Sequence, residues 1–232
     1  MKTIIILIAF SSLHLFVTGQ DYKGYNAFLK SNVTLSGEVD YKAINSNKSQ
    51  LASIFDSFKT NEPSKSDVKE EQLAYWINLY NIATISLIID NYPMKSIKDI
   101  AGGKPWDKDF IKVGNKLYSL NDIENKIIRP TFKDARIHFA LNCGAKSCPP
   151  LLNTAFVASS LNAQLDKQTK SFINDKSSNK ITTKSYMISR IFDWYSEDFG
   201  DLPSFINKYS TTKVGKGATK SFTDYNWSLN GK

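Results

Sequence analysis

The chain has 232 residues, of which 41% are hydrophobic and 22% charged, and its formal net charge is +8. This length is enough for one domain with a sizeable core. The lysines are spread along the chain, which indicates a solvated basic surface drawn to anionic polymers rather than a nucleic-acid groove. We therefore predict no nucleic-acid partner.

The amino end has the pattern of a secretory signal. Lys2 precedes an apolar run over residues 4–17, and Val17 and Gly19 supply small side chains just before a cleavage position. The run is too short for a permanent membrane helix, which needs about 20 apolar residues. No cysteine sits at the cleavage position, so a bacterial lipid anchor is not indicated. We predict a signal peptide over residues 1–19 and a secreted or periplasmic protein.

The remaining chain divides into a helical lead-in over residues 20–67 and a main domain over residues 68–230. In the lead-in, two stretches carry apolar side chains at helical spacing. The longest element of the main domain is a helix predicted from Asp67 to Asn91, and Asp67 with Glu70 resembles a capping box at its start.

Between Leu73 and Ile89 this helix is apolar nearly all round, so we expect it to run through the middle of the domain. It is not a plausible membrane span, because Asn78 and Asn81 would be costly unpaired in lipid. The two amides lie one turn apart and face roughly the same way. Each would cost about 1–3 kcal/mol if buried without a partner. They either bond neighbouring loop backbone or line a ligand pocket.

After the long helix, the pattern changes to that of strands. Residues 110–113 and 116–118 flank Gly114-Asn115, which predicts a two-residue hairpin. A short helix is expected next, with Asn121 as N-cap and Glu124 reaching back to it. This structural role for Glu124 competes with a role as a catalytic carboxylate. Arg129 closes the helix, where a cation suits the helix dipole.

The second half of the domain alternates between strands and helices. Residues 136–141 are short and apolar except for His138, which predicts a buried strand. Further elements are a helix over residues 161–174, a polar strand near 181–184, a helical segment over 188–199 and another after Pro203. The chain therefore predicts an α+β fold, a single domain with a buried central helix and a small antiparallel or mixed sheet.

Six phrases in this order resemble a known family of proteins. They are Tyr75-Trp-Ile-Asn-Leu-Tyr-Asn81, Pro93-Met-Lys-Ser-Ile97, Ser119-Leu-Asn-Asp-Ile-Glu124, Arg136-Ile-His-Phe-Ala-Leu-Asn-Cys143 with Ser147-Cys-Pro-Pro-Leu151, Phe192-Asp-Trp-Tyr-Ser-Glu-Asp-Phe199 and Asp224-Tyr-Asn-Trp-Ser-Leu-Asn230. Together they are similar to the domain of unknown function DUF547, over about residues 70–230. The resemblance implies no established activity. A relation to papain-like or transglutaminase-like folds is an analogy of fold, which does not carry function with it.

Both cysteines and one of the two histidines fall within eleven residues, as His138, Cys143 and Cys148. One hypothesis is a thiol-dependent amide or ester hydrolase with Cys143 as nucleophile, His138 as base and Glu124 as a third group. The base must lie within about 3 Å of the sulfur. In an extended strand the five steps from His138 to Cys143 span roughly 16 Å and place the side chains on opposite faces, which opposes this hypothesis.

A metal site would add a fourth ligand from the acidic group Asp193, Glu197, Asp198 and Asp201 to the same three residues. The strand geometry opposes this as well. The acidic group is better explained as an exposed helix face, with Asp201 as the N-cap ahead of Pro203. We predict no metal and no cofactor.

The hypothesis that we favour is a disulfide between Cys143 and Cys148. Exported proteins meet an oxidising environment, and an even number of cysteines fits pairing. A ring this small stabilises the fold by about 2 kcal/mol through loop entropy. His138 is then a core histidine bonded to Asn78, Asn81 or backbone.

The predicted function is the binding of a small polar or peptide ligand at a polar centre. The residues expected to bind the ligand are Asn78, Asn81, Arg129 and Asp193, beside Glu124, His138 and the cysteine loop. The alternatives are the thiol hydrolase, and a structural or adhesive surface module that has neither a pocket nor a reactive group.

Overall fold

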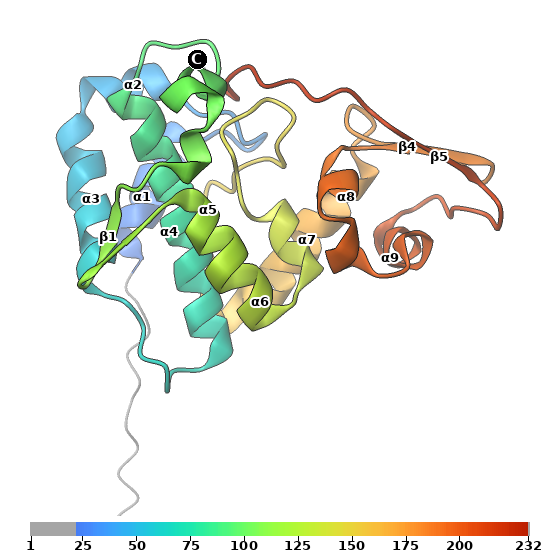
Figure 1. The fold of residues 1–232 in the computed structure, drawn as a ribbon, viewed down its shortest axis with the longest axis horizontal. Helices are drawn as coiled ribbons and strands as arrows, with labels where there is room; N and C mark the ends of the chain where they lie inside the picture. Colours follow the sequence, from blue (N-terminus) through green and yellow to red (C-terminus); the bar gives the residue numbers. More distant parts are fainter. Residues whose placement is uncertain (1–21, 232) are drawn as a thin grey trace, which may run out of the picture.

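The computed structural model describes residues 22–231, so the predicted signal peptide lies outside the described residues. Helices and two small sheets form a mixed α+β fold, which confirms the predicted class. Helices α1 (Lys23–Asn32), α2 (Tyr41–Ser46) and α3 (Lys48–Thr60) lie at one end, and strands β4 (Ser185–Ile188) and β5 (Thr219–Phe222) at the other (Figure 1).

Helix α4 (Lys69–Asp90) is the buried central helix that the apolar pattern predicts. It is long and apolar enough to cross a membrane by length and composition, but 89% of its apolar stretch is buried inside the protein. The predicted capping box is wrong. Val68 is the N-cap, and the Asp67 carboxylate instead accepts a hydrogen bond from the backbone N–H of Ser64 at 2.7 Å, in the turn before the helix.

The amino-terminal helices pack onto α4 through aromatic side chains. Phe58 of α3 contacts Tyr25 of α1 and Tyr75 of α4, with ring centroids 5.4 and 5.9 Å apart. The Tyr75 hydroxyl also donates a hydrogen bond to the Phe58 carbonyl at 2.7 Å. Residues of the lead-in and of α4 therefore share one hydrophobic core.

The predicted hairpin is confirmed as β1 (Ile111–Val113) and β2 (Lys116–Tyr118), paired antiparallel. The helical turn that follows it begins differently from the prediction. Ser119 rather than Asn121 is the N-cap of α5 (Leu120–Asp122), and Asp122 rather than Glu124 completes the capping box. The chain continues through a π-helical segment, Ile123–Ile128, into α6 (Arg129–Phe132). Glu124 is thereby free of capping and is directed into the protein.

The predicted buried strand over residues 136–141 is wrong, because the segment forms a 3-10 helix, Ala135–Phe139. Asp134 caps it by accepting hydrogen bonds from the backbone N–H and the guanidinium of Arg136. Short apolar runs suit a strand and a buried helical turn equally, so local capping decides between them. The argument that a stretched strand separates His138 from Cys143 therefore no longer applies.

A second hydrophobic core lies around Phe139 and joins α7 (Leu161–Asn174), α8 (Ile191–Trp194) and α9 (Leu202–Tyr209). Helix α7 and the helix after Pro203 are as predicted, and Asp201 caps α9 by accepting from the Ser204 N–H at 3.1 Å. Residues 188–199 form α8 and a separate 3-10 turn rather than one helical segment. The other 3-10 turns are Ile97–Asp99, Ala101–Gly103, Pro105–Asp107 and Ala158–Ser160.

The second sheet is mixed. Strand β3 (Lys180–Ile181) pairs antiparallel with β4, and β4 pairs parallel with β5. The polar strand predicted near residues 181–184 thus becomes two short strands joined by a turn. After β5 the chain crosses back towards the helical end of the molecule (Figure 1). On the way it bonds the cysteine loop, with Lys146 N–H donating to the Ser228 carbonyl at 2.7 Å and Asn230 N–H to the Gly144 carbonyl at 3.0 Å.

Candidate functional site

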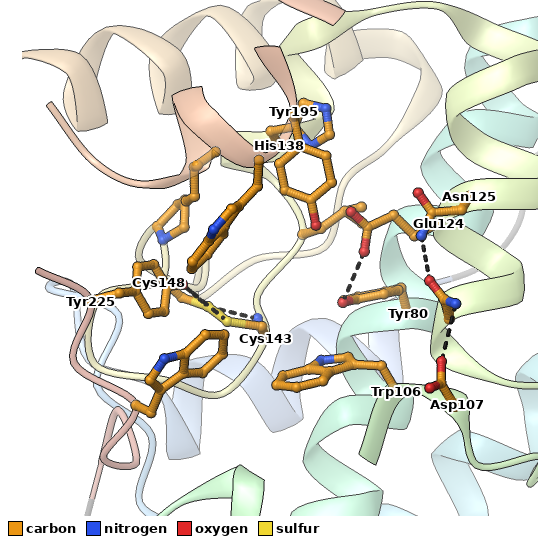
Figure 2. Close-up of a pocket in the computed structure, with 16 residues that line it drawn as sticks. Tyr80, Trp106, Asp107, Glu124, Asn125, His138, Cys143, Cys148, Tyr195 and Tyr225 are labelled. Atoms are coloured by element: carbon orange, nitrogen blue, oxygen red, sulfur yellow. Dashed lines mark hydrogen bonds between the residues drawn. A yellow bond between two sulfur atoms is a disulfide. The ribbon is translucent and has the colours of Figure 1, made fainter. Parts of the chain in front are cut away.

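A cavity of about 270 Å³ opens where α4, the π-helical segment, the cysteine loop, α8 and the carboxy-terminal segment meet. Figure 2 shows Tyr80, Trp106, Tyr195 and Tyr225 around a shared space, with the Glu124 side chain directed towards it. The lining combines aromatic rings with a few polar groups. Its volume is near the lower end of ligand sites, which suits a small occupant.

Six aromatic side chains line the cavity: Tyr80, Trp106, Trp194, Tyr195, Tyr225 and Trp227. The rings contact one another in series, with centroids 4.8 Å apart for Trp194 and Tyr225, 4.6 Å for Tyr225 and Trp227, and 5.4 Å for Trp227 and Trp106. Trp194 remains 47% exposed, a large apolar ring left open to solvent at this site.

Glu124 is the buried carboxyl group of the cavity and is only 7% exposed. The Tyr80 hydroxyl donates to its Oε2 at 3.3 Å, and the Tyr195 hydroxyl also donates to it. Burial raises the pKa of Glu124, and the hydrogen bonds from Tyr195 and Tyr80 and the charge of Arg129 oppose that rise without cancelling it.

His138 also lines the cavity, and its imidazole is bonded to Asp198 rather than to a cysteine. Nε2 lies 2.6 Å from Asp198 Oδ2, and Arg129 donates to both oxygens of the same carboxylate at 2.7 and 3.0 Å. The imidazole stacks on Tyr195 with centroids 4.0 Å apart. Burial lowers the pKa of His138 to about 4, although Asp198 favours the charged form, so the ring is neutral at pH 7.

Asp198 is held as a carboxylate by this arrangement. Burial alone would raise its pKa, but hydrogen bonds from Arg129 and His138 outweigh burial, and the pKa lies below the ordinary value. His138 is therefore a buried histidine as expected, while the partners predicted for it, Asn78, Asn81 or backbone, are wrong. Its partner lies 60 residues further along the chain.

The disulfide between Cys143 and Cys148 is present, with Cα atoms 6.1 Å apart, which confirms the favoured hypothesis. The Tyr225 hydroxyl donates to Cys148 Sγ at 3.2 Å and lies 3.3 Å from Cys143 Sγ. Gly144 adopts a φ of 78° in the loop, and a Cβ there would come within 2.6 Å of Ile88, so the loop requires glycine. Both sulfurs are bonded to each other, so Cys143 offers no thiolate to a neighbouring base.

Asn78 and Asn81 bond loop backbone, which was the structural alternative for these amides. Asn78 exchanges two hydrogen bonds with the backbone of Phe156, at 2.8 and 2.9 Å. Asn81 donates to the Ala140 carbonyl at 2.9 Å and accepts from the Asn142 N–H at 2.8 Å. Neither is among the residues that line the cavity.

The other two residues predicted to bind ligand lie beside the cavity rather than in it. Arg129 is not among the lining residues and contacts the site through Asp198, through Asn125, to which it donates at 2.6 Å, and over the ring of Tyr195, 5.2 Å from the centroid. Asp193 pairs with Arg190 at 3.0 Å, and its side chain is 42% exposed. Within residues 22–231, no three His, Cys, Asp or Glu side chains lie close enough together to hold a metal ion.

Sequence reasoning missed the aromatic wall, although a signal for part of it was present. Tyr225 and Trp227 are two residues apart in a non-helical segment, and that spacing places both rings on one side of an extended chain. Asp198 was considered only as a metal ligand or as part of an exposed face. No local pattern links it to His138.

The fold and site define a mixed α+β protein in which a disulfide loop and an aromatic wall enclose a buried carboxyl. Residues 63–173 match the family model described as "Protein of unknown function, DUF547". The chain therefore contains a DUF547 domain over these residues, which confirms the resemblance. The two carboxy-terminal phrases, over residues 192–199 and 224–230, lie outside the match. No significant match was found among curated proteins or among solved structures.

The disulfide has a measurable expected effect on stability. Replacing Cys143 and Cys148 together with serine is expected to lower the free energy of unfolding by about 2 kcal/mol, because the unfolded chain regains the entropy of a small loop. Urea denaturation of both proteins measures the difference. Reducing the unmodified protein should give the same loss, and an unchanged unfolding midpoint in both experiments would contradict a stabilising bridge.

Proposed function

We propose that the aromatic-lined cavity binds a small ligand that carries both an apolar face and a polar group. The observation that carries this proposal is the composition of the wall. Three of the four tryptophans of the chain, Trp106, Trp194 and Trp227, line one cavity of about 270 Å³ together with a buried carboxyl group. Aromatic side chains with a few placed polar groups are typical of small-molecule sites.

The exposure of Trp194 supports the same proposal. Burying a large aromatic side chain is worth a few kcal/mol, so an indole left 47% exposed beside a cavity has apolar surface available to an occupant. Two structural features keep the cavity in place without a ligand. The disulfide fixes the loop on one side, and the hydrogen bonds of Lys146 and Asn230 fix the carboxy-terminal segment across it.

The geometry favours binding over thiol chemistry. A cysteine hydrolase needs a thiolate within hydrogen-bond reach of its base. Here the sulfur of Cys143 is bonded to Cys148, and the Nε2 of His138 is bonded to Asp198. The proposed site suits either a side chain of a peptide or a free small molecule. Export of the protein, predicted from residues 1–19, would make an extracytoplasmic ligand the relevant one.

A fragment screen tests this proposal without assuming a ligand class. A library balanced between cationic, neutral and anionic fragments is examined by saturation-transfer NMR with the unmodified protein and with Trp194→Ala. We expect bound fragments whose signals fall at least threefold in the variant, because the indole forms part of the wall. Val68→Ala, which alters another exposed apolar side chain away from the cavity, is the matched control. Fragments that bind equally to both variants, or no binding at all, would contradict the proposal.

A further inference from the structure

We infer that the ligand is an organic cation, an ammonium group held between the aromatic faces and the carboxylates of Glu124 and Asp107; this inference rests on the proposed function. Recognition of an ammonium by aromatic rings is electrostatic, because the face of an aromatic ring is negative. Two features of the lining point to a cation, its charge and its aromatic rings, and its hydrogen-bonding groups are compatible with one.

The charge of the lining is opposite to that of the protein. The chain carries 30 Lys and Arg against 22 Asp and Glu, yet the cavity is lined by two carboxyl groups, Glu124 and Asp107, and by no lysine or arginine. His138 is neutral at pH 7. The Arg129 guanidinium donates to Asn125 of the lining, and its charge is paired with that of Asp198. An anionic ligand would find no charged partner in the lining, whereas a cation would find one or two.

The rings of the wall already attract cations of the protein itself. The Lys98 Nζ lies 4.9 Å from the ring centroid of Trp227, and the Arg129 guanidinium lies 5.2 Å from that of Tyr195. Neither Lys98 nor Arg129 is among the residues that line the cavity. The negative faces of these rings therefore attract cations, and the cavity is lined by three further rings, those of Trp106, Trp194 and Tyr225.

The carboxyl groups of the lining are acceptors, and two asparagine amides beside them are bonded within the site. Asn121 donates to Asp107 at 3.1 Å and accepts from Asn125, which in turn accepts from Arg129 at 2.6 Å. Figure 2 shows the links between Asn125, the neighbouring amide and Asp107 on one side of the site. Each of the two amides thus donates one hydrogen bond to a neighbouring side-chain oxygen. An ammonium group is stabilised by anionic acceptors and aromatic faces, and the lining supplies both in Glu124, Asp107 and its ring side chains.

Titration calorimetry with a pair of matched probes tests the inference. Choline and 3,3-dimethyl-1-butanol have nearly the same shape, and only choline is charged. At pH 8 we expect choline to bind the full chain at least tenfold more tightly than the alcohol. Glu124→Gln should weaken the binding of choline at least tenfold and change the affinity for the alcohol by less than twofold. Asp107→Asn removes the charge of the other carboxyl group and should weaken choline binding threefold or more. This variant replaces Glu124→Gln as the test if Glu124→Gln does not fold. Glu70→Gln, on an exposed face, is the control.

The possible outcomes separate this inference from the proposed function. Equal affinity for choline and the alcohol would overturn the cation and leave a binding cavity. If Glu124→Gln and Asp107→Asn both bind choline as tightly as the unmodified protein, the inference of a cationic ligand is also overturned. If the fragment screen finds ligands that depend on Trp194 but choline does not bind, the class of ligand is wrong while the site stands. If the fragment screen selects neutral sugars, the ligand is likewise not a cation, while the binding site stands.

Discussion

Replacing Asn81 with alanine is expected to lower the free energy of unfolding by about 2–6 kcal/mol. The Asn81 amide satisfies the carbonyl of Ala140 and the N–H of Asn142, both inside the protein. Removing it leaves two buried backbone groups without a partner, each costing about 1–3 kcal/mol. Chemical denaturation followed by circular dichroism measures the change. The variant should also lose ligand affinity, because these two bonds fix the segment between His138 and Cys143 against α4.

The matched control is Ser86→Ala on the same helix, where the side chain is only half-buried. This change should alter the free energy of unfolding by less than 1 kcal/mol, as is usual for substitutions away from buried networks. If Asn81→Ala is no more destabilising than Ser86→Ala, then the amide does not pin the loop, and the position of the cysteine loop must depend on other contacts.

The second large effect is a loss of stability at acidic pH that depends on His138. We expect His138 to reduce the free energy of unfolding by about 3 kcal/mol as the pH falls from about 6.5 to about 4. In the folded protein burial lowers the pKa of His138 to about 4, whereas the unfolded chain titrates near the ordinary value of 6.5. Between these values the unfolded state binds a proton that the folded state does not bind. Stability is therefore complete above pH 6.5 and is lost as the pH falls towards 4.

Other titratable groups of the site also change the free energy of unfolding with pH, some raising it and some lowering it. The effect of His138 is therefore measured as a difference between the unmodified protein and a His138 variant. The raised pKa of Glu124 favours the folded state as the pH falls, while the lowered pKa of Asp198 removes stability only in more acidic solution. Unfolding is measured across pH 4–8 for the unmodified protein and for His138→Gln. The variant should lack the steeper slope between pH 6.5 and 4. Parallel curves would show that His138 titrates normally in the folded state.

Patterns within single elements predicted much of the fold. The apolar run of residues 73–89 predicted a buried central helix, and Gly114-Asn115 predicted the hairpin turn, because both depend on local periodicity and turn chemistry. The pairing of Cys143 with Cys148 followed from chain proximity and an even cysteine count. Each of these features is encoded within a few turns of chain, where sequence spacing and spatial spacing agree.

The errors lie where two local solutions compete. Ser119 with Asp122 and Asn121 with Glu124 have the same three-residue spacing, and only the structure shows that the first pair caps the helix. That choice turns Glu124 from a capping residue into the buried carboxyl of the cavity. The segment from Ala135 to Phe139 is similar, since an apolar run of this length forms a 3-10 helix once Asp134 caps it.

The site itself depends on contacts between distant parts of the chain. The wall joins Tyr80 of α4 to Trp227 near the carboxy terminus, and His138 meets Asp198 across 60 residues. Periodicity carries no information about such pairs. The sequence located the cysteine loop, Glu124 and His138 but not the other polar residues of the lining, and assembling the site required the crossing of the carboxy-terminal segment over the loop.

The central claim is that an organic cation binds among the indoles of one cavity, and the indole N–H signals of the four tryptophans in a ¹⁵N NMR spectrum test it directly. Addition of choline should shift the signals of Trp106, Trp194 and Trp227, which line the cavity, and leave that of Trp76, which is buried within α4, in place. Unmoved signals from all four indoles at millimolar choline, or a shift of Trp76 as large as the others, would contradict the claim.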